Sequence, residues 1–137
     1  LIQIATSIVG AEWEYHHCRK LGQCLWEEKI GGTGAFTVKF IKIGDCVGLG
    51  VIDTQNKLSE NGTIIYLVLN DGDCYVSGSS VGYFGGGLKK REIVTVAIDL
   101  NSGIIQWKVG GQVRHQVTNE MLKDKKINWV SFIRLYD

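Results

Sequence analysis

The chain is 137 residues long and carries 15 basic and 14 acidic side chains, which gives a formal net charge of +1. This balance argues against a basic protein that follows nucleic-acid phosphates, and a hydrophobic content of 45% excludes intrinsic disorder. The sequence has 18 glycines and no proline, so its turns must be built from Gly, Asn, Asp and Ser. We predict a single domain over residues 1–137, because most domains have roughly this length.

Short β-branched and aromatic runs, separated by Gly, Asn and Asp, follow one another along the whole chain. They predict ten strands, at residues 2–8, 24–30, 35–43, 46–52, 63–69, 73–77, 93–100, 104–109, 112–117 and 127–135. Only residues 119–126 look helical, over about one turn. Strands without long helices predict an all-β fold, an antiparallel β-sandwich or barrel. The glycines inside the runs indicate bulges or close approach of neighbouring backbones.

The clearest alternation of apolar and polar residues lies between residues 93 and 117. Every second residue of the run 93–100 is apolar, and Trp107 continues this inward-facing set in the next run. Turns at 101–103 and 110–111 separate the runs. The segment therefore predicts a three-stranded meander with one buried face.

Three pieces of sequence resemble the SPRY domain, a module also found in tripartite-motif ubiquitin ligases. They are FTVKF followed by VGLGVID, the stretch DGDCYVSGSS, and IVTVAIDLNSGIIQWKVGG. The resemblance implies that, in the third piece, Asp99 precedes the hairpin turn, Gly103 closes it and Trp107 enters the core. The sequence departs from the family pattern at Arg91-Glu92, where the family has Gly-Asp, and at Gly110-Gly111, where it has Asn-Gly.

The resemblance implies a concanavalin-like jelly roll, a sandwich of two bent antiparallel sheets. It also implies a non-enzymatic role in protein interaction. Ligands in this family typically bind across loops at one end of the sandwich, often as a short peptide segment.

Residues of catalytic or metal-binding type do not form a convincing set. His16, His17, Cys18 and Cys24 match no usual zinc spacing, and neighbouring residues of a strand point to opposite faces. Nothing local activates Cys18, Cys46 or Cys74 as a nucleophile, and we expect His115 to be a partly exposed strand residue. We predict no catalytic residues, no metal and no cofactor.

Two groups of side chains are candidates for binding a partner, because aromatic and basic residues are enriched at interaction hot spots. The first group is an aromatic and basic segment, in which Phe84 could instead pack inward while the cations keep a strand edge soluble. The second is an early aromatic pair, in which Trp13 could instead cover the end of the sandwich. The candidate residues are Tyr83, Phe84, Lys89, Lys90 and Arg91 in the first group, and Trp13 and Tyr15 in the second. We expect other lysines, such as Lys123, Lys125 and Lys126, to protect strand edges.

The compartment is inferred from cysteine usage and from the absence of targeting signals. Four cysteines are too few for a disulfide scaffold and favour a reduced, cytoplasmic setting. No run reaches the ~20 apolar residues of a membrane-spanning helix, so we expect no membrane insertion. Because Leu1 opens the sequence without a signal-peptide pattern, we expect the chain to be a piece of a longer protein.

These observations predict a non-enzymatic interaction module that recognises another protein or a peptide segment through end loops. It would act within a larger intracellular protein, as a ligase adaptor or an assembly scaffold, and would not bind nucleic acid. A structural subunit of a large assembly and a carbohydrate-binding, lectin-like module are the alternatives.

Overall fold

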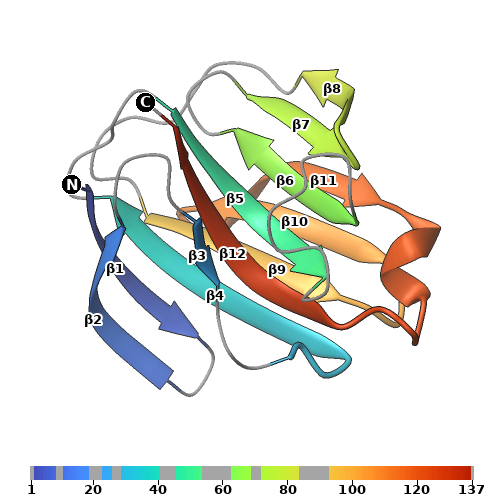
Figure 1. The fold of residues 1–137 in the computed structure, drawn as a ribbon, viewed down its shortest axis with the longest axis horizontal. Helices are drawn as coiled ribbons and strands as arrows, with labels where there is room; N and C mark the ends of the chain where they lie inside the picture. The colour runs from blue at the N-terminus through green and yellow to red at the C-terminus, as the bar shows by residue number, and fades with distance from the viewer. Residues whose placement is uncertain are drawn as a thin grey trace.

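The computed structural model describes residues 2–8, 11–18, 23–25, 29–40, 46–53, 63–68, 72–83 and 93–136, and side chains within 29–37, 48–53, 63–68, 72–82 and 93–133. Over these residues the chain forms two antiparallel sheets that pack on each other, as predicted for a β-sandwich (Figure 1). Each predicted run overlaps a strand, and the strand that overlaps the second run is Gln23–Leu25. In the described part of the chain, no helix is long and apolar enough to cross a membrane.

Six strands form the first sheet, here called sheet A. Their order is β11 (Gln112–Thr118), β10 (Ile104–Val109), β9 (Ile93–Asp99), β4 (Thr33–Phe40), β1 (Ile2–Ile8) and β2 (Ala11–Cys18). The predicted meander is confirmed, because β9, β10 and β11 are successive antiparallel neighbours. The sequence did not predict β2, whose polar and aromatic residues read as a loop; its pairing with β1 makes it the edge strand.

The second sheet, sheet B, also has six strands. Their order is β3 (Gln23–Leu25), β12 (Trp129–Tyr136), β5 (Cys46–Asp53), β6 (Ile64–Val68), β7 (Asp73–Val76) and β8 (Ser79–Tyr83). Strand β8 was also missed, because its Ser and Gly residues have low strand propensity. It pairs with β7 and ends the sheet. The helical turn predicted near residue 120 is the 3₁₀-helix η2 (Glu120–Lys123).

The main core lies between the two sheets and explains the alternation of apolar residues. In β9, Val94, Val96 and Ile98 are buried, while the residues between them are partly exposed on the outer face of sheet A. Over β9, β10 and β11 that outer face carries polar side chains, among them Gln106 and Gln116, which are joined by a hydrogen bond of 2.7 Å. One face therefore meets the core and the other meets water, which gives the strand a period of two.

Sheet B differs because its central strands are buried on both faces. All five residues of β6 are buried, and the outward-facing ones form a second apolar cluster. Three aromatic rings lie in this cluster: Tyr66 stacks on Tyr75 at 5.2 Å between ring centroids and meets Phe132 edge-on at 6.0 Å. Burial on both faces explains why β6 is a continuous apolar run rather than an alternating one.

Gly50 of β5 lies directly between two of these aromatic residues, opposite Phe132 on one side and Tyr66 on the other. A Cβ atom at Gly50 would overlap the backbone carbonyl oxygen of Ile65 and would lie 2.7 Å from the Cα of Tyr66. Backbone atoms cannot rotate away as a side chain can. The close backbone approach that intrastrand glycines indicated is confirmed at this position.

A buried hydrogen bond joins the two sheets. Trp107 of β10 is 1% exposed, and its indole Nε1–H donates to the backbone carbonyl of Leu49 in β5 at 2.9 Å. The prediction that Trp107 packs in the core is confirmed. Trp129 is also fully buried, but within the described residues its Nε1–H has no hydrogen-bond partner.

The prediction that His115 is partly exposed is wrong. His115 is 5% exposed and lies opposite Trp107, whereas Val113 is 47% exposed and lies opposite Lys108. The register between β10 and β11 shifts at this point, and Arg114 is the extra residue of the resulting bulge. The bulge places Val113 and His115 on opposite faces although they are two residues apart. Burial, together with the charge of Arg114, lowers the pKa of His115 below its usual value.

We expect Trp107→Phe to lower the free energy of unfolding by about 1–3 kcal/mol more than Trp129→Phe. Both substitutions shrink a buried indole, but only the first removes a buried hydrogen bond. Urea denaturation of the two variants measures the difference. Equal losses would show that the hydrogen bond to Leu49 adds nothing to stability.

We expect Gly50→Ala to destabilise the fold by about 3 kcal/mol or more, because the backbone would have to move to admit a methyl group. Gly31→Ala is the matched control, since a Cβ atom there would have nothing within 4 Å. Thermal unfolding of both variants tests the claim. A similarly small change of the melting temperature in both variants would contradict this, because it would mean that β5 and β6 can move apart with no loss of stability.

Candidate functional site

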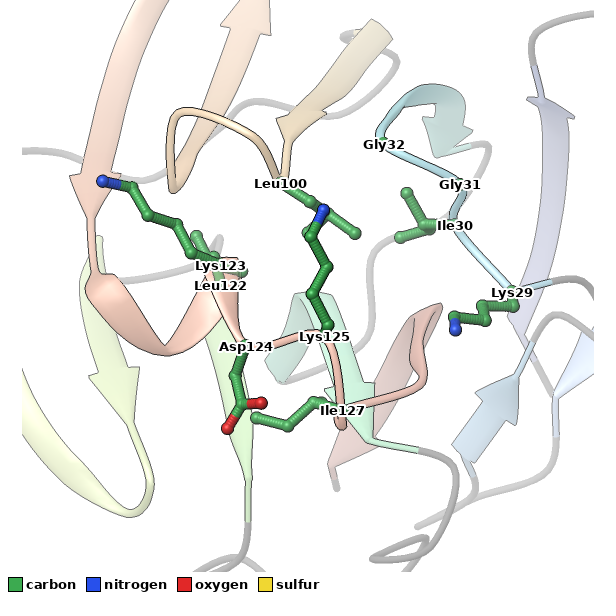
Figure 2. A pocket seen from close by; sticks show the side chains of 10 residues that line it. All are labelled: Lys29, Ile30, Gly31, Gly32, Leu100, Leu122, Lys123, Asp124, Lys125 and Ile127. Carbon is green, nitrogen blue, oxygen red and sulfur yellow. The ribbon is translucent and has the colours of Figure 1, made fainter.

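A pocket with a volume of about 190 Å³ lies at one end of the sandwich. At this end β9 leads into β10, the chain enters β4, and η2 leads into β12 (Figure 1). The lining residues are 29–32, Leu100, 122–125 and Ile127, here called the end pocket (Figure 2). Three segments that are far apart in the sequence therefore form one concave surface.

Backbone hydrogen bonds hold these three segments together. The Leu100 N–H donates to the Gly32 carbonyl at 2.7 Å, which joins the β9–β10 turn to the segment before β4. The Ile30 N–H donates to the Trp129 carbonyl at 2.9 Å, which joins that same segment to sheet B. Because these bonds link both sheets, the walls of the pocket are fixed in place without a ligand.

Gly103 allows η2 to approach the β9–β10 turn. Its φ of +71° is in the left-handed region, and a Cβ atom there would lie 2.9 Å from the Asn119 carbonyl oxygen. The Asn119 N–H donates to the Gly103 carbonyl at 2.9 Å, and the Asn119 side chain caps η2 by accepting from the Met121 N–H. A larger residue at Gly103 would push η2, and with it Leu122, away from the pocket.

The floor of the end pocket is apolar. Ile30 and Leu122 are buried, and Leu100 and Ile127 are partly exposed toward the opening. Figure 2 shows Ile30, Leu100 and Ile127 gathered around the same space. Such a floor favours an apolar group over a polar one, because it offers no side-chain hydrogen bond to replace those with water.

The rim of the end pocket is basic. Lys29 points inward from one wall, and Lys125 extends across the opening toward Leu100 (Figure 2). Within the described residues neither lysine forms an ion pair or a hydrogen bond. Lys123 pairs with Glu120 at 3.2 Å between Nζ and Oε1, and its ammonium group points away from Lys125.

The sequence did not single out this pocket. Lys123 and Lys125 were expected only to protect strand edges. The structure places both lysines in the segment around η2, not on an edge strand. The sequence does contain a Gly-rich segment at 31–34 and a Lys-rich segment at 123–126. No local pattern, however, indicates that the two segments lie together in the fold.

The predicted partner-binding residues lie elsewhere or outside the described residues. Tyr83 ends β8 opposite Asp73, which lies at the end of sheet B away from Trp129 and the pocket. Trp13 and Tyr15 are in edge strand β2, at the opposite corner of the molecule from β8 (Figure 1). Tyr83 and the pair in β2 therefore lie far apart in the molecule. The predicted residues outside the described part are Phe84, Lys89, Lys90 and Arg91.

Cys74 is a core residue, as its apolar surroundings in the sequence indicate. It is fully buried between the sheets, and burial raises the pKa of its thiol to about 12. It is therefore a thiol, not a reactive thiolate, at neutral pH. Among the residues that the structure describes, no three His, Cys, Asp or Glu side chains are grouped to hold a metal ion. The side chains of His16, His17, Cys18 and Cys24 are not part of that description.

The fold and the end pocket define an antiparallel β-sandwich with a small, loop-lined pocket at one end. No protein-family model matches the sequence, and no curated protein matches it. A functional assignment therefore depends on the chemistry of the pocket and on the three sequence motifs named above.

Asp99 stabilises the turn that carries Leu100. Its Oδ1 accepts hydrogen bonds from the Asn101 and Ser102 N–H groups at 3.0 and 3.1 Å, and its Oδ2 accepts from the Ser102 hydroxyl at 3.0 Å. These bonds favour the charged form, so the pKa of Asp99 lies below its usual 3.8. The ionised carboxylate therefore stabilises the fold above pH 3.8, and this contribution is lost as the pH falls through the lower folded-state pKa.

We expect Asp99→Asn to reduce stability at neutral pH by an amount that shrinks in acid and vanishes well below pH 3.8. The asparagine keeps the shape of the side chain and removes its charge. Denaturation of both proteins across this pH range measures the difference, and Ser102→Ala should cause a smaller loss over the same range. A difference that stays constant into strong acid would contradict the stabilising role of the charge.

Proposed function

We propose that this chain is a non-enzymatic protein–protein interaction module that holds a segment of a partner protein in the end pocket. The observation that carries the proposal is the joining of three loop segments into one fixed pocket with an apolar floor. A site whose walls are fixed before binding loses little conformational entropy when a partner arrives, which favours affinity.

The size of the pocket supports a partner side chain as its occupant. A volume of about 190 Å³ is smaller than the roughly 300–1,000 Å³ of sites that take drug-sized molecules. It is comparable to the roughly 150 Å³ that is enough for a benzene ring. One branched aliphatic or aromatic side chain matches this space, and the rest of a peptide would lie across the loops around it.

The resemblance to SPRY domains points in the same direction. It implies recognition of a peptide segment across loops at one end of the sandwich, and the end pocket is such a place. On the same basis we propose that the chain acts within a larger intracellular protein, as a ligase adaptor or an assembly scaffold. The surface around Tyr83 stays a predicted second site, at the other end of the molecule.

A peptide-display experiment tests the proposal. Random heptapeptides are selected for binding to the chain, and the enriched peptides are measured against variants by fluorescence anisotropy. We expect Leu100→Ala and Ile127→Ala each to weaken binding by about tenfold, because each removes apolar contact worth about 1.4 kcal/mol.

Two controls locate the site. Val113→Ala removes an exposed apolar side chain far from the pocket and should leave affinity unchanged, as should Tyr83→Ala at the opposite end. The pocket assignment would be wrong if Tyr83→Ala lost binding while the two pocket variants kept full affinity. The binding site would then be the predicted surface around Tyr83. Thermal unfolding of each variant checks that a loss of affinity is not a loss of fold.

A further inference from the structure

We infer that the partner segment is acidic, with one apolar side chain that enters the end pocket and carboxylates beside it that meet the lysines of the rim. This inference depends on the proposed function, since it names the chemistry of the segment that the same pocket would hold. The proposed occupant is a peptide, although the pocket by its size and apolar floor would also admit other small apolar groups.

The charge around the opening carries the inference. Three lysines line the pocket, Lys29, Lys123 and Lys125, against one carboxylate, Asp124. The whole chain has a net charge of only +1, so this concentration of cations belongs to the rim and not to a generally basic surface. A cluster of one sign attracts ligands of the other sign and raises their rate of encounter.

Among the side chains that the structure describes, the acidic ones nearby leave two of these lysines without counter-ions. Glu120 pairs with Lys123. The Oδ1 of Asp124 accepts from the Lys126 N–H at 2.9 Å, and Figure 2 shows the Asp124 carboxylate turned away from the ammonium groups of Lys29 and Lys125. Lys29 and Lys125 therefore present positive charge to the opening, and a partner carboxylate would complete an ion pair with each.

The arrangement of the two lysines fits a short peptide better than a single anion. They belong to different segments: Lys29 points inward from one wall, and Lys125 reaches across the opening toward Leu100 (Figure 2). An extended peptide places successive side chains on alternate faces at about 3.3 Å per residue, so residues on either side of an anchor can reach the two walls. Lysine is a flexible point charge, so Asp and Glu should serve equally well.

The backbone at Gly31 leaves room for that peptide. Gly31 lines the pocket, and a Cβ atom there would meet nothing within 4 Å. A partner backbone can therefore approach this wall closely. Gly31→Val should fold normally and bind more weakly, because its side chain would occupy space that the peptide needs.

The test uses the random heptapeptide selection on the full chain, followed by synthetic peptides. We expect enriched sequences to contain one Leu, Ile, Met or Phe with Asp or Glu on either side. Replacement of the acids by Asn or Gln should weaken binding about tenfold, and binding should weaken markedly between about 0.05 M and 0.5 M salt, because the rim is exposed. Enriched peptides that lack acidic residues would overturn the inference.

Charge reversal provides the matched comparison within the chain. Lys29→Glu and Lys125→Glu should each lower affinity for the acidic peptides by about fivefold to tenfold, since an exposed attraction becomes a repulsion. Lys108→Glu makes the same change in net charge on the outer face of sheet A, opposite Val113, and should have no effect. Equal affinities for all three variants would overturn the inference.

The outcomes separate this inference from the proposed function. If Ile127→Ala weakens binding but Lys29→Glu and Lys125→Glu do not, the pocket binds peptides and the acidic preference is wrong. If no heptapeptide is enriched, or if Ile127→Ala has no effect on the enriched ones, the proposed function and this inference both fail.

Discussion

The hydrogen bond from the Trp107 indole to the Leu49 carbonyl is the interaction on which the packing of the two sheets depends. Hydrophobic contacts between sheets are not directional, so they allow small shifts of one sheet over the other. A buried directional bond allows far less freedom, because breaking it in the core leaves the indole N–H without a partner. The bond at 2.9 Å therefore fixes β10 against β5.

That alignment of the sheets has consequences at the end of the sandwich. Strand β10 follows the turn that carries Leu100, and sheet B contains β12, which follows Ile127. The segment at 29–32 bonds to both, through Gly32 and Ile30. The end pocket is thus the place where loops from two aligned sheets meet, and its shape follows from the packing of the core.

The outward-facing sides of the two sheets differ in polarity. Over β9, β10 and β11 the outer face of sheet A is polar, while the outward-facing cluster of sheet B is apolar and buried. The close approach of backbones at Gly50, flanked by the rings of Tyr66 and Phe132, belongs to that buried cluster. These interactions stabilise the sandwich without using the side chains of the end pocket, its lysines and its apolar floor.

The sequence by itself determined the strands with a clear pattern, such as β9 and β10, because side-chain alternation is a local property of each run. It also placed Trp107 and Cys74 in the core. Strands β2 and β8 were missed because pairing with a neighbour, not propensity, makes them strands. His115 was misjudged because a bulge depends on the partner strand. Only the tertiary structure decided that residues near 30, 100 and 125 share one pocket, because contacts between residues so far apart leave no mark in a local pattern.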